Sequence, residues 1–437
     1  MKKSEFKNIF TALVFLFLIL SLPAKAFSAQ TQFTPLITIT EEYTDNFYRT
    51  RKNKDDEFST RYQAVLSFSV IDKQDSLVIE YSPNYTDYMD RNENDAWNHT
   101  LSVDAVLHAS KKTILSFSDS YNRSLNRTVR TNTFEKHDTN TGTAALRHQF
   151  GRNDFFNLSY TYAFDNYENP NQDEFKTHRP SAYMMYWFSP QFGLDINASY
   201  SKTDFEISTN ELETLQGDLR ILKKINPHLD AYVKYAHTYT EQTGGDHVIY
   251  NPSIGFQWNP TEDSGIVLGG GVLFQEYQNN SEADSERFFL EFDVYKNFNF
   301  SRRHNLSITG SSRYNDINEA ASSLGFTINY QAGFLHTYRL TRRLSSELRG
   351  SFNLSEYGEP GVDRKDETLT MGAGLVWSPL RWLNFNFSYE FTDFNTDSTL
   401  DDYQEHRAFI STTITPQEPL RMNSSTPRQV LEGRLFN

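Results

Sequence analysis

The chain of 437 residues contains no cysteine. This absence excludes disulfides, thiolate nucleophiles and thiolate metal sites. Basic residues are outnumbered, because 42 Lys and Arg stand against 56 Asp and Glu, for a formal net charge of −14. Such a balance argues against a polyanionic partner, so nucleic acid is not expected. After residue 26 the sequence also lacks any apolar run of the length that a membrane-spanning helix needs.

The N-terminus carries the one long apolar run of the sequence. Three lysines precede this run of residues 9–22, and Ala24-Lys25-Ala26 supplies a small-x-small cleavage site. The run is shorter than the roughly 20 residues of a membrane-spanning helix. We therefore predict a signal peptide over residues 1–26, with Ala29 as an alternative cleavage site.

The remaining sequence shows apolar and polar residues in strict alternation, in segments of about ten residues that recur to residue 414. One clear example is residues 383–392, in which one face is aromatic and apolar and the other is polar: Leu383, Phe385, Phe387, Tyr389 and Phe391 against Asn384, Asn386, Ser388, Glu390 and Thr392. Strands of this length with one apolar face are typical of barrels that cross a bilayer.

The pattern predicts an all-β fold, a single antiparallel transmembrane β-barrel of about 20 strands, with 18 or 22 as alternatives. The strands run from residues 36–48 to residues 406–414, with short turns and longer polar loops in alternation. We assign residues 27–414 to the barrel and residues 415–437 to a C-terminal periplasmic tail. A β-propeller has a similar repeat length, but its blades need four short strands where this sequence offers two long ones.

Aromatic residues at the strand ends place the barrel in a membrane, since Trp and Tyr prefer the headgroup level of a bilayer. Short turns and long loops on opposite sides match a bacterial outer membrane, with both termini in the periplasm. The candidates for the two interfacial girdles are Tyr43, Tyr85, Tyr167, Trp187, Trp258, Trp377 and Trp382.

The sequence offers no catalytic constellation. Its histidines do not gather with Ser or Asp in one place, so no enzyme is expected and we identify no catalytic residue, cofactor site or metal site. The triplet 269–271 is all glycine, but it lies inside a strand pattern without the lysine and helix of a phosphate loop. We interpret it as a point of bending or close packing in the barrel wall.

Charged residues on the polar phase of the strands should line the interior, and both signs are present. Such a lining either closes the lumen through internal ion pairs or surrounds a water-filled pore, whereas a ring of one sign would predict ion selectivity. The lumen-lining candidates are Arg61, Glu80, Asp104, Asp195, Asp218, Arg220, Lys234, Glu291, Asp293, Arg313, Glu347, Arg349 and Glu390.

Residues 42–48 (EYTDNFY), residues 81–85 (YSPNY) and the recurring turns of the form Trp-(x)-Ser/Asn-Pro resemble a family of outer-membrane β-barrel porins often associated with exopolysaccharide loci. The resemblance implies an outer-membrane barrel, and it carries over no functional residue. It suggests a porin-like channel for passive diffusion or export, linked to exopolysaccharide secretion. The alternative is a non-conducting structural or adhesive barrel whose loops bind glycan or a partner. Expected partners are outer-membrane lipids and lipopolysaccharide, the outer-membrane assembly machinery, and a polysaccharide or its export machinery.

Overall fold

The computed structural model describes residues 29–127, 134–169, 174–207, 211–242, 246–278, 284–319, 322–359, 362–397 and 402–421. The predicted signal peptide and most of the predicted tail lie outside these ranges. The first ten strands are β1 (Gln30–Thr44), β2 (Glu57–Asp72), β3 (Asp75–Tyr88), β4 (Ala96–Ser110), β5 (Thr113–Arg127), β6 (Phe134–Gln149), β7 (Phe155–Tyr167), β8 (Phe175–Trp187), β9 (Phe192–Phe205) and β10 (Glu211–Asn226).

The second half of the chain repeats this plan of long strands. Its strands are β11 (Leu229–Gln242), β12 (His247–Thr261), β13 (Ser264–Tyr277), β14 (Ser285–Ser301), β15 (His304–Glu319), β16 (Ser322–Arg339), β17 (Leu344–Glu359), β18 (Val362–Leu380), β19 (Leu383–Thr396), β20 (Tyr403–Ile414) and the two-residue β21 (Leu420–Arg421). One short 3-10 helix, η1 (Asn92–Asn94), lies between β3 and β4. No helix in the described ranges is long and apolar enough to span a membrane.

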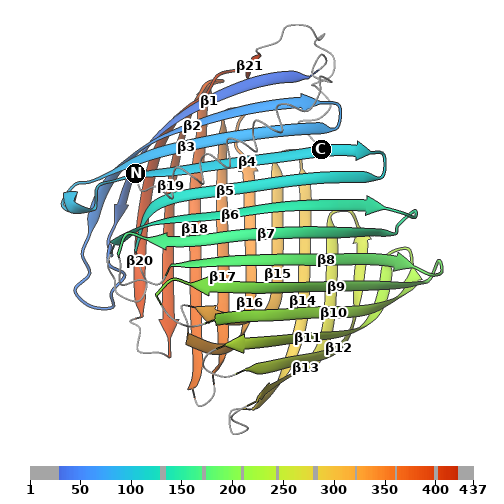
Figure 1. Ribbon diagram of the computed structural model, residues 1–437. Helices are drawn as coiled ribbons and strands as arrows, with labels where there is room; N and C mark the ends of the chain where they lie inside the picture. Colours follow the sequence, from blue (N-terminus) through green and yellow to red (C-terminus); the bar gives the residue numbers. More distant parts are fainter. Residues whose placement is uncertain are drawn as a thin grey trace.

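Each strand pairs in antiparallel register with the next, and β20 returns to pair with β1. The sheet is therefore a closed barrel of 20 strands, which confirms the predicted fold class. In Figure 1 the strands of the near wall, such as β4–β10, run across those of the far wall, such as β15–β18. Opposite walls must cross in this way when strands are tilted to the barrel axis.

The closing seam is built by two segments of the C-terminal region. β20 pairs with the second half of β1, from Ile37 opposite Ile414 to Thr44 opposite Arg407. β21 pairs with the first half of β1, where Phe33 lies opposite Leu420. Part of the predicted tail therefore extends the seam.

The outer face of the barrel is apolar, as the alternation predicts. Large side chains on this face remain exposed, such as Ile254 at 66% and Val233 at 57%. Exposed apolar side chains on every wall would be costly in water, and a bilayer covers them. The hydrophobic effect therefore explains why the strands are long enough to span the hydrocarbon region and why their outer residues alternate with polar ones.

The predicted girdle residues divide between the two faces. Tyr43, Tyr85, Trp258 and Trp377 lie on the outer face, and Trp382 lies in the turn between β18 and β19, 38% exposed. Tyr167 and Trp187 differ from the expectation, because each lies one residue out of phase with its outward neighbours. Tyr167 contacts His137, and the ring of Trp187 lies over Gly193 beneath Lys224.

Tyrosine and histidine also meet on the outer face near the long loops, a feature that the sequence analysis did not identify. Three hydrogen bonds of this kind join neighbouring strands diagonally: Tyr81 to His99 at 2.8 Å, Tyr160 to His178 at 2.6 Å and Tyr389 to His406 at 2.5 Å. Rings with one apolar and one polar edge suit the boundary between lipid and water. These pairs therefore belong to the same interfacial belt as Tyr43 and Tyr85.

Candidate functional site

The interior of the barrel is the candidate site, and strand alternation decides which side chains face it. On β11, Tyr232 and Ala236 are 3% and 4% exposed, whereas the intervening Val233 and Tyr235 are 57% and 45% exposed. Lys234 shares the phase of Tyr232, so this phase faces inward. By the same alternation and the strand registers, all thirteen predicted lumen-lining residues lie on the interior face.

A first cluster of these residues lies on β9–β14. Arg220 forms an ion pair with Asp195, which is 3% exposed. Lys234 Nζ lies 2.8 Å from the Glu291 carboxylate. Asp218 accepts a hydrogen bond of 3.0 Å from Asn197 Nδ2. Charges of opposite sign on different strands are therefore paired, which offsets the cost of removing them from water.

The glycines of β12 and β13 explain how the ion pair between Lys234 and Glu291 spans two intervening strands. The Tyr232 side chain lies flat across Gly255 and Gly269, since a Cβ at either glycine would be 2.5 Å from the Tyr232 hydroxyl. That hydroxyl donates to Glu291 at 3.3 Å. The glycine triplet is thus a site of close packing in the wall, one of the two interpretations drawn from the sequence.

A second cluster crosses the closing seam. Arg407 on β20 pairs with Glu42 on β1 at 2.5 Å and with Glu390 on β19 at 3.6 Å. Glu390 also forms an ion pair of 2.8 Å with Arg349 on β17. Sequence analysis identified Arg349 and Glu390 but missed Glu42 and Arg407, although both lie on the polar phase of their strands.

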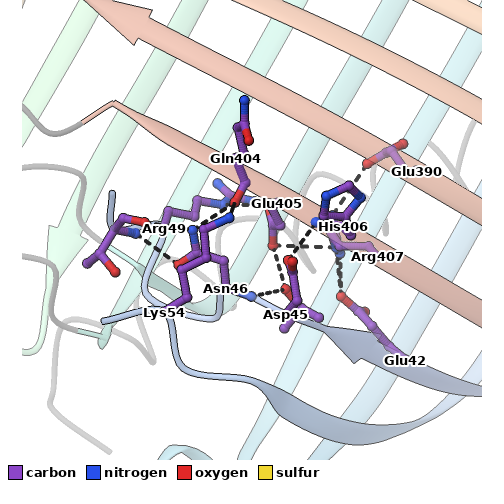
Figure 2. A network of polar contacts seen from close by, with 12 residues as sticks. Glu42, Asp45, Asn46, Arg49, Lys54, Glu390, Gln404, Glu405, His406 and Arg407 are labelled. Carbon is purple, nitrogen blue, oxygen red and sulfur yellow. Dashed lines mark hydrogen bonds and ion pairs between the residues drawn. The ribbon is translucent and has the colours of Figure 1, made fainter. Parts of the chain in front are cut away.

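Figure 2 shows how this network continues toward the long loops. Glu405, which is 4% exposed, accepts hydrogen bonds from Thr44 and from Arg49 of the loop after β1, both at 3.0 Å. The buried Asn46 side chain donates to the backbone oxygens of Thr50 and Gln404 at 2.8 Å. The seam is therefore closed by side chains as well as by the strand ladder.

The interior charges differ in how tightly they are paired. Asp293 and Arg313 are loosely paired, because their charged groups come no closer than 4.0 Å and their side chains are 55% and 74% exposed. Glu347 lies 3.5 Å from Arg349. Arg61, Glu80 and Asp104 on β2–β4 take part in no ion pair with any residue that the structure describes. The wall around β2–β4 therefore offers charges that solutes can meet.

Hydroxyl groups cover much of the interior wall between these charges. They hydrogen bond across neighbouring strands in pairs: Thr143 with Thr161 at 3.0 Å, Ser159 with Ser181 at 2.6 Å and Thr177 with Thr203 at 2.9 Å. Hydroxyls both donate and accept, so each can exchange its strand partner for a solute. The β6–β9 wall is thus polar without carrying a dominant charge.

The interior of β11–β13 and of the loop-side part of β14 is packed, in contrast. Ile249, Leu273 and Phe289 form an apolar cluster with Ile328 from the outward phase of β16, and its members are 0–2% exposed. Polar residues of the same wall are also buried, including Thr240 and Gln275 at 0% and 1%. The lumen therefore has one filled side and one hydroxyl-lined side.

Two long loops pack together on the side of β1–β6. The Arg91 guanidinium, from the loop after β3, lies over the rings of Phe47 and Tyr48 at 4.8 and 5.1 Å. It also pairs with Glu57, and Phe47 stacks on Phe134 at 5.0 Å. This group of residues, which we name the loop cluster, gives the loop end an ordered aromatic and charged surface.

The chain is similar in fold to several solved structures. It is similar to the siderophore receptor PirA from Pseudomonas aeruginosa, with 10% identity and a TM-score of 0.50 over 88% of this chain and 80% of that chain. PirA from Acinetobacter baumannii gives 9% identity and a TM-score of 0.50 over 88% and 80%. A mutant of the ferric enterobactin receptor PfeA from Pseudomonas aeruginosa, in complex with enterobactin, gives 8% identity and a TM-score of 0.50 over 88% of this chain and 81% of that chain. Identities this low show the fold alone.

Sequence comparison adds a match to a family. None of the curated protein sequences matches the chain. Residues 297–415, from within β14 to just past β20, match the model of the family described as "Putative beta-barrel porin 2". This match, over the C-terminal part of the barrel, is consistent with the outer-membrane porin family that the sequence resembles, and the chain is an outer-membrane β-barrel.

Proposed function

We propose that the barrel is a porin-like channel for neutral or weakly charged hydrophilic solutes, by passive diffusion or export, with both termini in the periplasm. Sugars and glycans are the proposed cargo, in keeping with a link to exopolysaccharide secretion. The observation that carries the proposal is the hydroxyl-lined wall of β6–β9. Serine and threonine hydroxyls offer a sugar the same donors and acceptors that water offers.

The interior charges support a neutral cargo. Asp195 with Arg220, Lys234 with Glu291 and Arg349 with Glu390 cancel one another locally. A filter for ions would instead present a ring of one sign. The channel is therefore proposed to select weakly by charge, and no chemical step is assigned to it.

A second candidate function is a non-conducting surface barrel. The packed interior of β11–β14 favours it, since buried side chains leave less room for solutes. The loop cluster around Arg91 also favours it, because an ordered aromatic surface suits the binding of a glycan or a protein partner. In that case loop substitutions, and not interior ones, would change function.

Planar-bilayer conductance and sugar uptake by vesicles test the two candidates on the refolded mature protein. A channel gives stable conductance steps and admits neutral sugars. The variant Thr161→Trp, on the interior face of β7, should lower the uptake of sugar, whereas Tyr160→Trp on the outer face of the same strand should not. A folded barrel that is silent in both assays would contradict the channel and support the surface barrel.

A further inference from the structure

The ladder between β14 and β15 is shorter than the strands that form it. β14 pairs with β13 over nearly all its length, from Ser285 to Lys296. It pairs with β15 only from Asp293, opposite Ser311, to Ser301. β15 continues to Glu319, in register with β16. The wall therefore splits beyond Ser311, in the half of the barrel nearer the long loops.

Ser312 ends the ladder at this point. Its hydroxyl donates to the backbone oxygen of Leu290 at 2.5 Å and accepts from the backbone N–H of Phe292 at 2.8 Å. A side chain thus takes the place that the β15 backbone would occupy. Backbone groups of alternate residues point to opposite sides of a strand, so those of Phe288 and Leu290 face the split. No strand in the described part of the chain pairs with that edge of β14 beyond Asp293.

Beyond the split, the β15–β16 hairpin lies inside β14. On the short-turn side of the split, the lipid-facing side of this hairpin carries Ile308 and Phe334, which are 41% and 38% exposed. On the long-loop side of the split, the same face carries Tyr314 and Ile328. The Tyr314 ring meets Phe289 of the β14 interior face at 5.5 Å, edge to face. The outer face of one strand pair therefore overlaps the inner face of the other.

Beyond the two hydrogen bonds of Ser312, the overlap is sealed by apolar contacts. Ile328, Phe289 and Leu273 are 1%, 2% and 0% exposed, and Tyr314 packs against them. Contacts of this kind have no preferred direction, so they allow sliding more readily than a ladder of hydrogen bonds. On the lipid side of β14, Phe288 and Leu290 are 70% and 40% exposed.

The split thus connects two environments. Outside lie Phe288 and Leu290 in the hydrocarbon region, and inside lies the apolar cluster. Glu291, paired with Lys234, follows Phe289 by two residues on the interior face. A molecule with a hydrocarbon chain and a polar head would find matching surroundings along this path.

From this geometry we propose that β14 and β15 form a lateral gate. The hydrocarbon chain of a single-chain amphiphile passes between them, from the apolar cluster to the bilayer, while its polar head stays in the lumen near Lys234 and Glu291. The gate opens when the β15–β16 hairpin slides off β14, which breaks the two hydrogen bonds of the Ser312 side chain but no ladder hydrogen bond. This inference is independent of whether sugars also pass along the barrel axis.

Photolabelling tests the gate. The refolded protein, in vesicles that contain a diazirine derivative of palmitic acid, is irradiated, and the labelled residues are mapped by mass spectrometry. An open gate gives label on the inward-facing Leu273 as well as on the outward-facing Phe288. Label confined to Phe288 and other outward residues would overturn the proposal.

A removable bridge distinguishes lateral entry from entry along the axis. In Phe289→Cys/Tyr314→Cys, a reducible bifunctional thiol reagent fastens the overlap, and the chain offers no other thiol. We expect the label on Leu273 to fall to background with the bridge and to return after reduction. The matched control is Asn297→Cys/Ser307→Cys, whose positions are ladder partners below the split and whose bridge should change nothing. Labelling of Leu273 that persists with the first bridge would contradict lateral entry.

Discussion

At the scale of single residues, glycines decide what the barrel wall can carry. Gly255 and Gly269 leave room for the Tyr232 ring to lie against the wall and reach Glu291. Gly270, between two inward glycines, faces lipid, where a Cβ would meet Phe288 at an ordinary 3.5 Å. Adjacent glycines of one triplet therefore have different roles.

Substitution of these glycines separates the two roles. Gly269→Val should lower the free energy of unfolding by about 1–3 kcal/mol, because its side chain would displace Tyr232 in a packed wall. Gly270→Val should change it by less than about 1 kcal/mol, since β-branched residues suit an exposed strand face. Urea unfolding in vesicles measures both values. Equal losses for the two variants would mean that Tyr232 does not need the space above Gly269.

At the scale of strands, the barrel has two unlike junctions. The β1–β20 seam holds eight ladder pairs from Ile37 to Thr44, and Arg407 adds ion pairs to three carboxylates beside it. The β14–β15 junction ends its ladder at Ser311 and continues as an apolar overlap. At the closing seam, polar side chains add to a complete ladder. At the split, the polar side chain of Ser312 bonds the β14 backbone in place of the ladder.

Removal of the seam arginine tests the first junction. Arg407→Gln should destabilise the barrel by about 1–3 kcal/mol, because Glu42 and Glu390 would lose the charge that compensates them in a partly buried place. Arg313→Gln is the matched control, since that side chain is 74% exposed and 4.0 Å from its partner. Unfolding in urea should show little change for the control, and a loss as large as that of Arg407→Gln would contradict the special role of the seam.

Amide hydrogen exchange tests the second junction. The N–H groups of Phe288 and Leu290 face the split, whereas those of Phe289 and Glu291 face the β13 ladder. We expect the first two to exchange faster than the second two, because local opening frees an edge that no ladder holds. Below the split, the amides of Val294 and Lys296 face β15, whereas those of Tyr295 and Asn297 face β13 and its turn, and all four should be protected alike. Equal protection of all four amides above the split would indicate a closed ladder in solution.

The sequence predicted most of the strands because period-2 alternation reports directly which face meets lipid. It placed all thirteen charged candidates on the interior phase. Tyr167 and Trp187 were assigned to the girdles by their places at strand ends, although the phase of their strands turns them inward. Tertiary contact decides for Tyr314, which has the outward phase of β15 but packs against Phe289. Alternation predicts the side of the sheet to which a residue points, but it does not predict which other strand the residue packs against.

At the scale of the whole molecule, the interior is divided into a packed half and a hydroxyl-lined half. β11–β13 and the loop-side part of β14 bury many of their interior side chains to a few per cent exposure. By contrast, Arg61, Glu80 and Asp104 on β2–β4 take part in no ion pair with a described residue. A solute that crosses the barrel would therefore follow the wall of β2–β9. Its charge preference would depend on these few groups.

Charge reversal on this wall tests the path. Glu80→Lys/Asp104→Lys should shift the reversal potential of a bilayer in a salt gradient toward anions, because an interior wall that gains positive charge attracts them. Neutral sugar uptake should stay near the wild-type rate, since hydroxyl groups and not charges accommodate it. Asp87→Lys, on the outer face of the β3 strand that carries Glu80, should leave the reversal potential unchanged. If the double variant conducts with unaltered selectivity, solutes do not follow this wall, and the path must run through the packed half.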